Sequence, residues 1–201
     1  MTARAAAGAF GDGPALVESS FPVEEPLEAS GRSPLDFRSL FEMEASYVVR
    51  TLRRLGVAPA DVEDMAHEVF LAVYGQLEHY DRSRPVRPWL FAFAFRVAAQ
   101  YRRKARRETD LSAVGEVPDH REPPDARLER EGKQRMVLDA LEAVELERRA
   151  VFVLHELDGA TCQEIARSLG IPLGTVYSRL RLARDDFSGA VRRLQAQRGR
   201  P

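Results

Sequence analysis

Apolar residues recur mostly at three- and four-residue steps between positions 35 and 55, a spacing typical of an amphipathic α-helix. Gly56 follows the last of them, where glycine commonly ends a helix. Pro59 and Asp61 then mark the start of a second helix, with apolar residues at a similar spacing over 62–77. The pattern predicts two helices separated by a short break at Gly56.

The next segment, 88–107, is unusual in its aromatic content. Pro88 suits the first turn of a helix, and nothing breaks a helix before Arg107. From Arg82 to Arg107 the chain holds nine Arg or Lys and no Asp or Glu. The aromatic residues of this segment are Trp89, Phe91, Phe93, Phe95 and Tyr101.

A helix needs only one apolar stripe to join a core, so we expect some of these rings to face outward. Outward rings beside guanidinium groups would suit unpaired nucleic-acid bases, because bases stack on rings while Arg holds phosphate. The alternative is a core helix that carries more apolar surface than it needs and ends in a solvated basic stretch.

Residues 108–132 are acidic, contain three prolines and lack a core period, which predicts a linker. A second helical region begins at about Arg127, with one helix around 136–144 and another over 145–157. Asp158 and Gly159 form a predicted turn.

The pattern after this turn predicts a helix-turn-helix. Thr161 and Glu164 have the spacing of a capping box, which starts a short helix. Gly170 ends that helix in the left-handed conformation, and a long helix runs from Leu173 to about Leu194. The N-terminal part of such a second helix enters the major groove of DNA. The alternative is a small helical bundle with a charged surface helix.

Charge is segregated although the formal net charge is only −1. Residues 35–107 carry 13 basic and 9 acidic side chains, and residues 133–201 carry 12 and 9. Between them, residues 108–132 carry 3 basic and 8 acidic side chains. Two basic blocks on an acidic tether indicate two modules that face nucleic acid.

Composition excludes several other classes of protein. The single Cys162 cannot form an internal disulfide, which fits a reducing cytosol. The four His are scattered and no metal-binding motif is present, so we expect no metal and no cofactor. No apolar run is long enough to span a bilayer and no signal peptide is visible, so we expect a cytoplasmic protein without membrane insertion. Residues 1–34 lack any helical or strand period and are expected to be disordered.

Taken together, these motifs resemble the extracytoplasmic-function (ECF) group of bacterial sigma factors, in the sigma-70 superfamily. Asp61-Val-Glu-Asp64-Met-Ala-His-Glu68-Val-Phe70 resembles the acidic helix with which that family docks on polymerase. Arg84-Pro-Val-Arg-Pro-Trp89-Leu-Phe resembles its promoter-melting segment, and 158–180 resembles its C-terminal helix-turn-helix. The chain departs from the family pattern at His67, Arg96, Tyr177 and Leu182.

The resemblance implies an all-α protein with two small helical domains. The domains would be a region 2 domain over 35–107 and a region 4 domain over 133–195, followed by a basic tail at 196–201. Region 2 would bind the β′ clamp of core RNA polymerase and the melted −10 element. Region 4 would bind the −35 duplex and the β flap, and an anti-sigma factor would be a further partner.

The resemblance also implies a role for each matched residue. The polymerase contact would include Asp61, Asp64, Glu68 and Phe70. The −10 region would be bound by Arg84, Arg87, Trp89, Arg96, Arg102 and Arg103, with Trp89 as the wedge at the melting edge. The −35 element would be bound by Thr175, Tyr177, Ser178, Arg179, Arg181 and Arg184.

Three functions remain open from sequence. The first is a promoter-specificity subunit that directs core polymerase, acts with no catalytic residue of its own and is therefore not an enzyme. The second is an autonomous helix-turn-helix regulator of duplex DNA, which would have no use for the basic aromatic helix. The third is a nucleic-acid-processing enzyme, which would need clustered carboxylates that the basic helix lacks.

Overall fold

The computed structural model describes residues 36–111 and 127–198. These residues belong to one compact unit, Ser33–Pro201. The predicted disordered extension at 1–34, the centre of the predicted linker and the end of the basic tail lie outside the described residues. Every regular element within the described residues is helical, so the predicted all-α class is confirmed.

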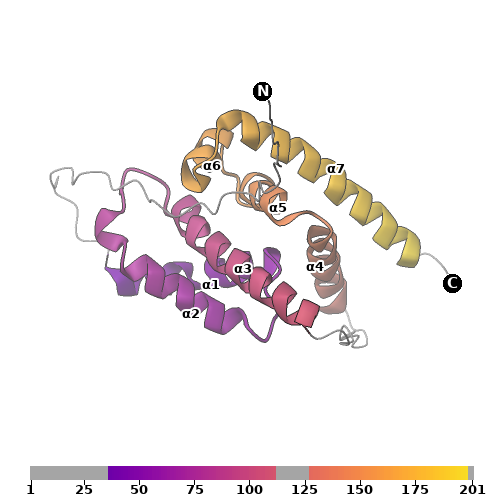
Figure 1. Cartoon of the computed structure of the whole chain (residues 1–201), viewed down its shortest axis with the longest axis horizontal. Helices are drawn as coiled ribbons and strands as arrows, with labels where there is room; N and C mark the ends of the chain where they lie inside the picture. The colour runs from indigo at the N-terminus through magenta and orange to yellow at the C-terminus, as the bar shows by residue number, and fades with distance from the viewer. Residues whose placement is uncertain (1–35, 112–126, 199–201) are drawn as a thin grey trace, which may run out of the picture. The chain divides into compact units, whose positions relative to one another are not determined.

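Three helices form the N-terminal module (Figure 1). They are α1 (Phe37–Arg54), α2 (Val62–Tyr74) and α3 (Val86–Leu111), with a 3₁₀ turn, η1 (Leu77–His79), between α2 and α3. Each helix packs on the other two. The shared core is apolar and closed to solvent, and it includes Leu40, Val48, Leu52, Val69, Val73, Leu90 and Phe91.

Four helices and a π turn form the C-terminal module (Figure 1). They are α4 (Arg127–Glu142), α5 (Leu146–Phe152), η2 (Val153–Leu157), α6 (Cys162–Leu169) and α7 (Leu173–Arg198). The long α7 packs on α4, α5 and α6, and the Phe152 and Phe187 rings lie 4.8 Å apart across the α5–α7 contact. The predicted single helix over 145–157 is therefore divided, because its last five residues widen into a π turn.

The start and end of the helix-turn-helix follow the sequence prediction. The Thr161 hydroxyl accepts from the Glu164 amide at 3.2 Å, and Glu164 accepts from the Thr161 amide at 2.8 Å. These hydrogen bonds lower the pKa of Glu164. Gly170 ends α6 at φ 65°, in the left-handed region. The capping box and the glycine stop are thus confirmed.

Helix boundaries differ from prediction at the start of the linker, whereas α4 begins at the predicted start of the second helical region. α3 starts two residues before Pro88 and continues to Leu111, while α4 begins at Arg127. Helix therefore overlaps the predicted linker, 108–132, at each end. The overlapping stretches are rich in Glu, Arg and Leu, which are good helix formers whatever their charge. α7 also runs four residues beyond the predicted end at Leu194.

A buried arginine joins α4 to α5. Arg149 is 0% exposed, and it donates to the carbonyls of Val144 at 3.0 Å and Glu142 at 2.9 Å. Burial, together with the nearby Arg102 guanidinium, lowers the pKa of Arg149 to about 10. Its Nη1 atom has no hydrogen-bond partner among the described residues. The periodicity of the sequence did not predict that Arg149 lies in the core, because a charged side chain is rarely buried without a partner.

We predict that Gly170→Ala lowers the free energy of unfolding by about 1–2 kcal/mol, the cost of a side chain in the left-handed conformation. The cause is conformational alone, because a Cβ at Gly170 would meet no atom within 4 Å. Gly174→Ala is the matched control. Gly174 also has open space for a Cβ but lies within α7 without a positive φ. Alanine there should be neutral or stabilising by up to about 1 kcal/mol. Urea denaturation of both variants is the measurement, and equal losses would contradict the account.

Candidate nucleic-acid interface

The loop that precedes α3 is held by its own side chains. Asp81 accepts from the amide and the hydroxyl of Ser83 at 2.9 and 2.7 Å. It also pairs with Arg84 at 2.9 Å, and the Tyr80 hydroxyl donates to the Arg84 carbonyl at 2.5 Å. The Ser83 bonds first, and then Arg84, lower the pKa of Asp81. This Asx-type turn fixes the entry into α3 and leaves the loop itself on the surface.

The rings of α3 divide between core and surface. Phe91 and Phe93 are buried at 0% and 3% exposure, so these two rings do not face outward. Trp89, Phe95 and Tyr101 are half-buried. The Trp89 ring lies 4.5 Å from that of Tyr80 and 5.0 Å from that of Phe93. The Tyr101 hydroxyl donates to Asp61 at 2.7 Å. Trp89 therefore packs on Tyr80 and Phe93 and remains partly accessible to solvent.

The basic side chains of α3 and of the loop before it differ in how exposed they are. Arg96 is half-buried, and burial lowers its pKa. Arg102 is half-buried as well, whereas Arg103 is exposed. Arg84 and Arg87 are exposed at the start of the helix. The predicted −10 residues thus follow one helix and the loop before it, but they differ in how much of each guanidinium solvent can reach.

The predicted −35 residues lie on the first three turns of α7. Tyr177, Ser178, Arg181 and Arg184 are exposed, while Thr175 and Arg179 are half-buried. The apolar residues between them, Val176, Leu180 and Ala183, are buried against the module. The 3.6-residue period of the helix therefore presents the polar set on one side, as major-groove recognition requires.

Ion pairs distinguish the arginines of α7. Arg179 donates to Glu147 of α5, and Arg184 donates to Glu156 of η2 at 2.8 Å. These two side chains are thus held against their own module. Arg181 is exposed and makes no such contact within the described residues. Of the three, Arg181 is the one with its full charge available to DNA.

The acidic helix α2 presents a separate surface. Glu63, Asp64, His67 and Glu68 are exposed along its outer side. Two predicted polymerase residues differ from expectation. Phe70 is only 4% exposed and packs on the ring of Phe41 at 4.7 Å, because its position faces the α1–α2 core. The Asp61 carboxylate is bonded to Tyr101. Phe70 and Asp61 therefore support the acidic surface of α2 from within the module, whereas Asp64 and Glu68 can contact a partner directly.

Two family models match the chain, and they match the two modules. One is sigma-70 region 2, over residues 40–108, and the other is sigma-70 region 4, over residues 134–186. The ECF RNA polymerase sigma factor SigL of Mycobacterium tuberculosis is 32% identical over 151 residues, covering 73% of this chain and 83% of that protein.

The chain belongs to the ECF group of the sigma-70 family.

Other relatives agree with this membership. The ECF RNA polymerase sigma-E factor of Escherichia coli is 28% identical over 167 residues, covering 78% of this sigma factor and 87% of that protein. Among solved structures, RpoE in complex with the anti-sigma factor NepR from Bartonella quintana shares the fold. Its TM-score is 0.58 at 17% identity, with 78% of this chain and 97% of that chain covered. CnrH in complex with the cytosolic domain of CnrY gives a TM-score of 0.53 at 24% identity, covering 76% and 85% of the two chains.

The protein is therefore a sigma factor that directs bacterial RNA polymerase to promoters. The comparisons give no support to the autonomous regulator considered from sequence. No helix of the described residues has the length and apolarity to cross a membrane.

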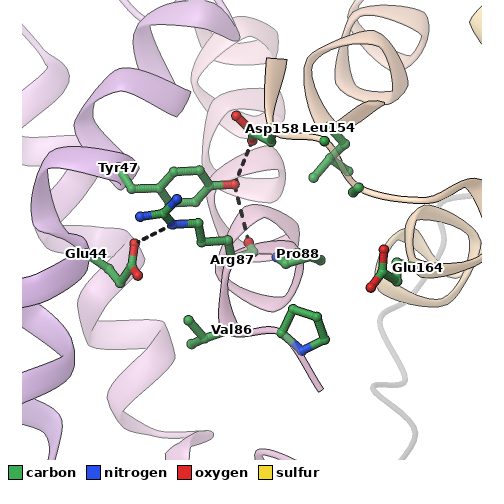
Figure 2. Close-up of a pocket in the computed structure, with 11 residues that line it drawn as sticks. Glu44, Tyr47, Val86, Arg87, Pro88, Leu154, Asp158 and Glu164 are labelled. Carbon is green, nitrogen blue, oxygen red and sulfur yellow. Dashed lines mark hydrogen bonds and ion pairs between the residues drawn. The ribbon is translucent and has the colours of Figure 1, made fainter. Parts of the chain in front are cut away.

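The structure also brings together residues that sequence analysis did not connect (Figure 2). Tyr47 of α1, Arg87 of α3 and Asp158 of the C-terminal module line one hollow of about 340 Å³. Tyr47 is 4% exposed, and burial first, then Asp158, raises its pKa, so it remains a hydrogen-bond donor. No local motif could have indicated this set, since its members lie 40 and 111 positions apart.

We predict that Arg181→Ala in the holoenzyme weakens binding to a cognate promoter by about 1–3 kcal/mol, the usual cost of losing one arginine contact to a base edge. Arg192→Ala is the control. Arg192 is exposed on the same helix but three turns further on, beyond the part that enters a groove. Its loss should cost less than about 0.5 kcal/mol. Filter binding over a salt series measures both, and equal losses would argue against the assignment of Arg181.

Proposed function

We propose that this sigma factor captures the unpaired −10 strand with the start of α3 and reads the −35 duplex with the start of α7. The observation that carries the proposal is the pairing of two exposed basic surfaces, each on a family-matched module, with half-buried Trp89 at the edge of the first. Neither module offers many base contacts. Polymerase would hold both in one frame, so that binding by one raises the effective concentration of the other.

The residues at the start of α3 have the chemistry that capture of an unpaired DNA strand requires. The predicted site combines an exposed loop with Arg84 and Arg87, the Trp89 edge, and the arginines further along the helix. Flipping a base out of the duplex costs a few kcal/mol, which stacking and phosphate contacts offset. Trp89 would stack at the last paired step, and Arg96, Arg102 and Arg103 would follow the strand. The protein would act by binding alone and hence without catalysis. No group of three or more metal-ligand residues gathers in 36–111 or 127–198.

The outer side of α2 would dock on the β′ clamp of core polymerase. Its exposed acids include Asp64 and Glu68, which suit a basic partner. The C-terminal module would bind the β flap, and the whole complex would act in the cytoplasm. An anti-sigma factor is proposed as a further partner, because two solved structures with this fold are complexes with CnrY and with the anti-sigma factor NepR.

The direct test is run-off transcription with purified core polymerase on a library of genomic fragments. We expect promoter-dependent transcripts only when the sigma factor is added, with a shared −10 and −35 motif upstream of the start sites. Equal run-off from core alone would refute the proposal. Tight and selective duplex binding without core would instead point to an autonomous regulator.

We predict that Trp89→Ala leaves holoenzyme assembly intact but blocks strand opening at the −10 element. The ring contacts Tyr80 and Phe93, whereas the proposed polymerase surface is the exposed side of α2, so polymerase binding should not change. The melting edge loses its stacking partner, at a cost of about 1–3 kcal/mol. Trp89→Phe, which keeps a ring against Tyr80 and Phe93, should retain part of the activity. Permanganate reactivity of the −10 thymines is the measurement. Normal reactivity in Trp89→Ala would remove this role from the ring.

A further inference from the structure

The turn between α1 and α2 brings two arginine side chains to one point. Gly56 lies in this turn at φ 89° and is half-buried. A Cβ built on Gly56 would lie 2.7 Å from the Nη1 atom of Arg149 and closer still to the Nη1 atom of Arg102. The guanidinium groups of α5 and α3 therefore lie within a few ångströms of each other, against the glycine. Only a residue without a side chain leaves room for them.

The Arg149 guanidinium is buried with one nitrogen unsatisfied. Its Nε and Nη2 atoms donate to the Val144 carbonyl at 3.2 and 3.0 Å, and Nη2 also donates to the Glu142 carbonyl at 2.9 Å. Its Nη1 atom is buried and has no hydrogen-bond partner in the part of the chain that the structure describes. A buried charged donor without a partner is costly. The nitrogen that lacks a partner is the one that faces Gly56 and Arg102.

Arg102 also lacks a counter-charge. It is half-buried and makes no hydrogen bond or ion pair within 36–111 and 127–198. Burial, and then the Arg102 charge, lower the pKa of Arg149 to about 10, so Arg149 is still protonated at neutral pH. Glu142 and Glu145 act in the opposite direction, but both are exposed, and the Glu145 carboxylate is engaged as the N-cap of α5. Two like charges thus meet with no acid in contact among the described residues.

The backbone of the turn does not supply the missing partner. The Gly56 amide donates to the Arg53 carbonyl at 3.1 Å, and the Val57 amide donates to the Leu52 carbonyl at 3.0 Å, which closes the end of α1. The carboxyl end of a helix has a partial negative charge and favours nearby cations. This effect reduces the cost of the arginine pair but gives Nη1 of Arg149 no hydrogen bond. An anion would supply both the charge and the acceptor atoms.

The geometry also limits the size of the anion. Two donors that share one oxygen at about 2.9 Å can be at most about 6 Å apart. The two Nη1 atoms meet this condition, because both lie close to the same point at Gly56. Phosphate and sulfate carry several oxygens, and guanidinium groups bind them through charge-assisted hydrogen bonds. Gly56 and Arg102 are partly exposed, whereas Arg149 is 0% exposed. A small anion can therefore enter beside Gly56 when the Arg102 side chain shifts.

We propose that Arg102 and Arg149 form a binding site for one small oxyanion, a phosphate group that is either free or carried by a nucleotide, against Gly56. The anion bridges the two Nη1 atoms, satisfies the buried donor and offsets the like charge. Binding requires neither polymerase nor DNA, so the proposal stands apart from the promoter-reading function. Bound phosphate stabilises the folded chain, because the unfolded chain does not hold the two arginines together.

The test is calorimetric titration of the full chain with inorganic phosphate at constant ionic strength, with chloride as the balancing anion. We expect one phosphate per chain, and a higher Tm in phosphate than in chloride. Arg102→Gln should weaken binding about tenfold or more, the usual effect of losing one charge-assisted hydrogen bond. Arg103→Gln is the matched control, since Arg103 is the next residue of α3 and is exposed. This variant makes the same change of charge and should bind phosphate as the wild type does.

The variants are chosen so that folding does not decide the outcome. Arg102 makes no hydrogen bond within the described ranges, so Arg102→Gln should fold, whereas Arg149 is tied to two carbonyls. If circular dichroism shows that Arg102→Gln is unfolded, Arg102→Lys takes its place. That variant keeps the charge but loses the planar fork, so it should also bind more weakly. Wild-type affinity in the folded Arg102 variant, equal weakening in Arg103→Gln, or no saturable binding by the wild type overturns the site.

A second titration, with ATP in the absence of magnesium, identifies the source of the phosphate group. ATP that competes with inorganic phosphate at one site per chain points to a nucleotide, and ATP that does not compete points to free phosphate. In both cases the effect of Arg102→Gln has to exceed that of Arg103→Gln. Binding of several ATP molecules with equal sensitivity to both variants would show a general attraction to the basic helix and would overturn the proposal.

Discussion

The packing of α3 against α1 and α2 constrains everything else in the N-terminal module. Leu90, Phe91 and Phe93 are buried in that contact, and they fix the rotation of the helix about its axis. Once this rotation is set, Trp89 has to lie at the margin, and the arginines that follow have to lie along the remaining surface. The core therefore determines the site. The residues that could contact a DNA strand are those of α3 that do not pack into the core.

In the C-terminal module, too, buried apolar residues determine which side of a helix is exposed. Val176, Leu180 and Ala183 hold α7 on its module, and the intervening polar residues are turned outward. Ion pairs to Glu147 and Glu156 then restrain Arg179 and Arg184. Exposed ion pairs of this type contribute little to stability. Their effect is on geometry, because they determine which guanidinium is held beside the protein and which stays exposed to solvent.

The junction between the modules differs in kind from either core. It includes a carboxylate, a phenol and guanidinium groups, and it contains an unsatisfied buried donor on Arg149. Polar junctions of this composition have a smaller free energy of association than hydrophobic ones and respond more readily to a competing partner.

Sequence alone determined the helices, the two-module plan and the family, because these follow from periodicity, from caps such as Thr161 and Glu164, and from motifs that are continuous in the chain. It also placed the start of α7 and the start of α3 as the candidate surfaces. Only the tertiary structure decided that Phe93 is internal, that Arg149 is buried, and that Tyr47 meets Asp158. Periodicity reports which residues share a helix face but not which face meets a neighbour, so contacts made across 111 positions are set by packing and not by any local pattern.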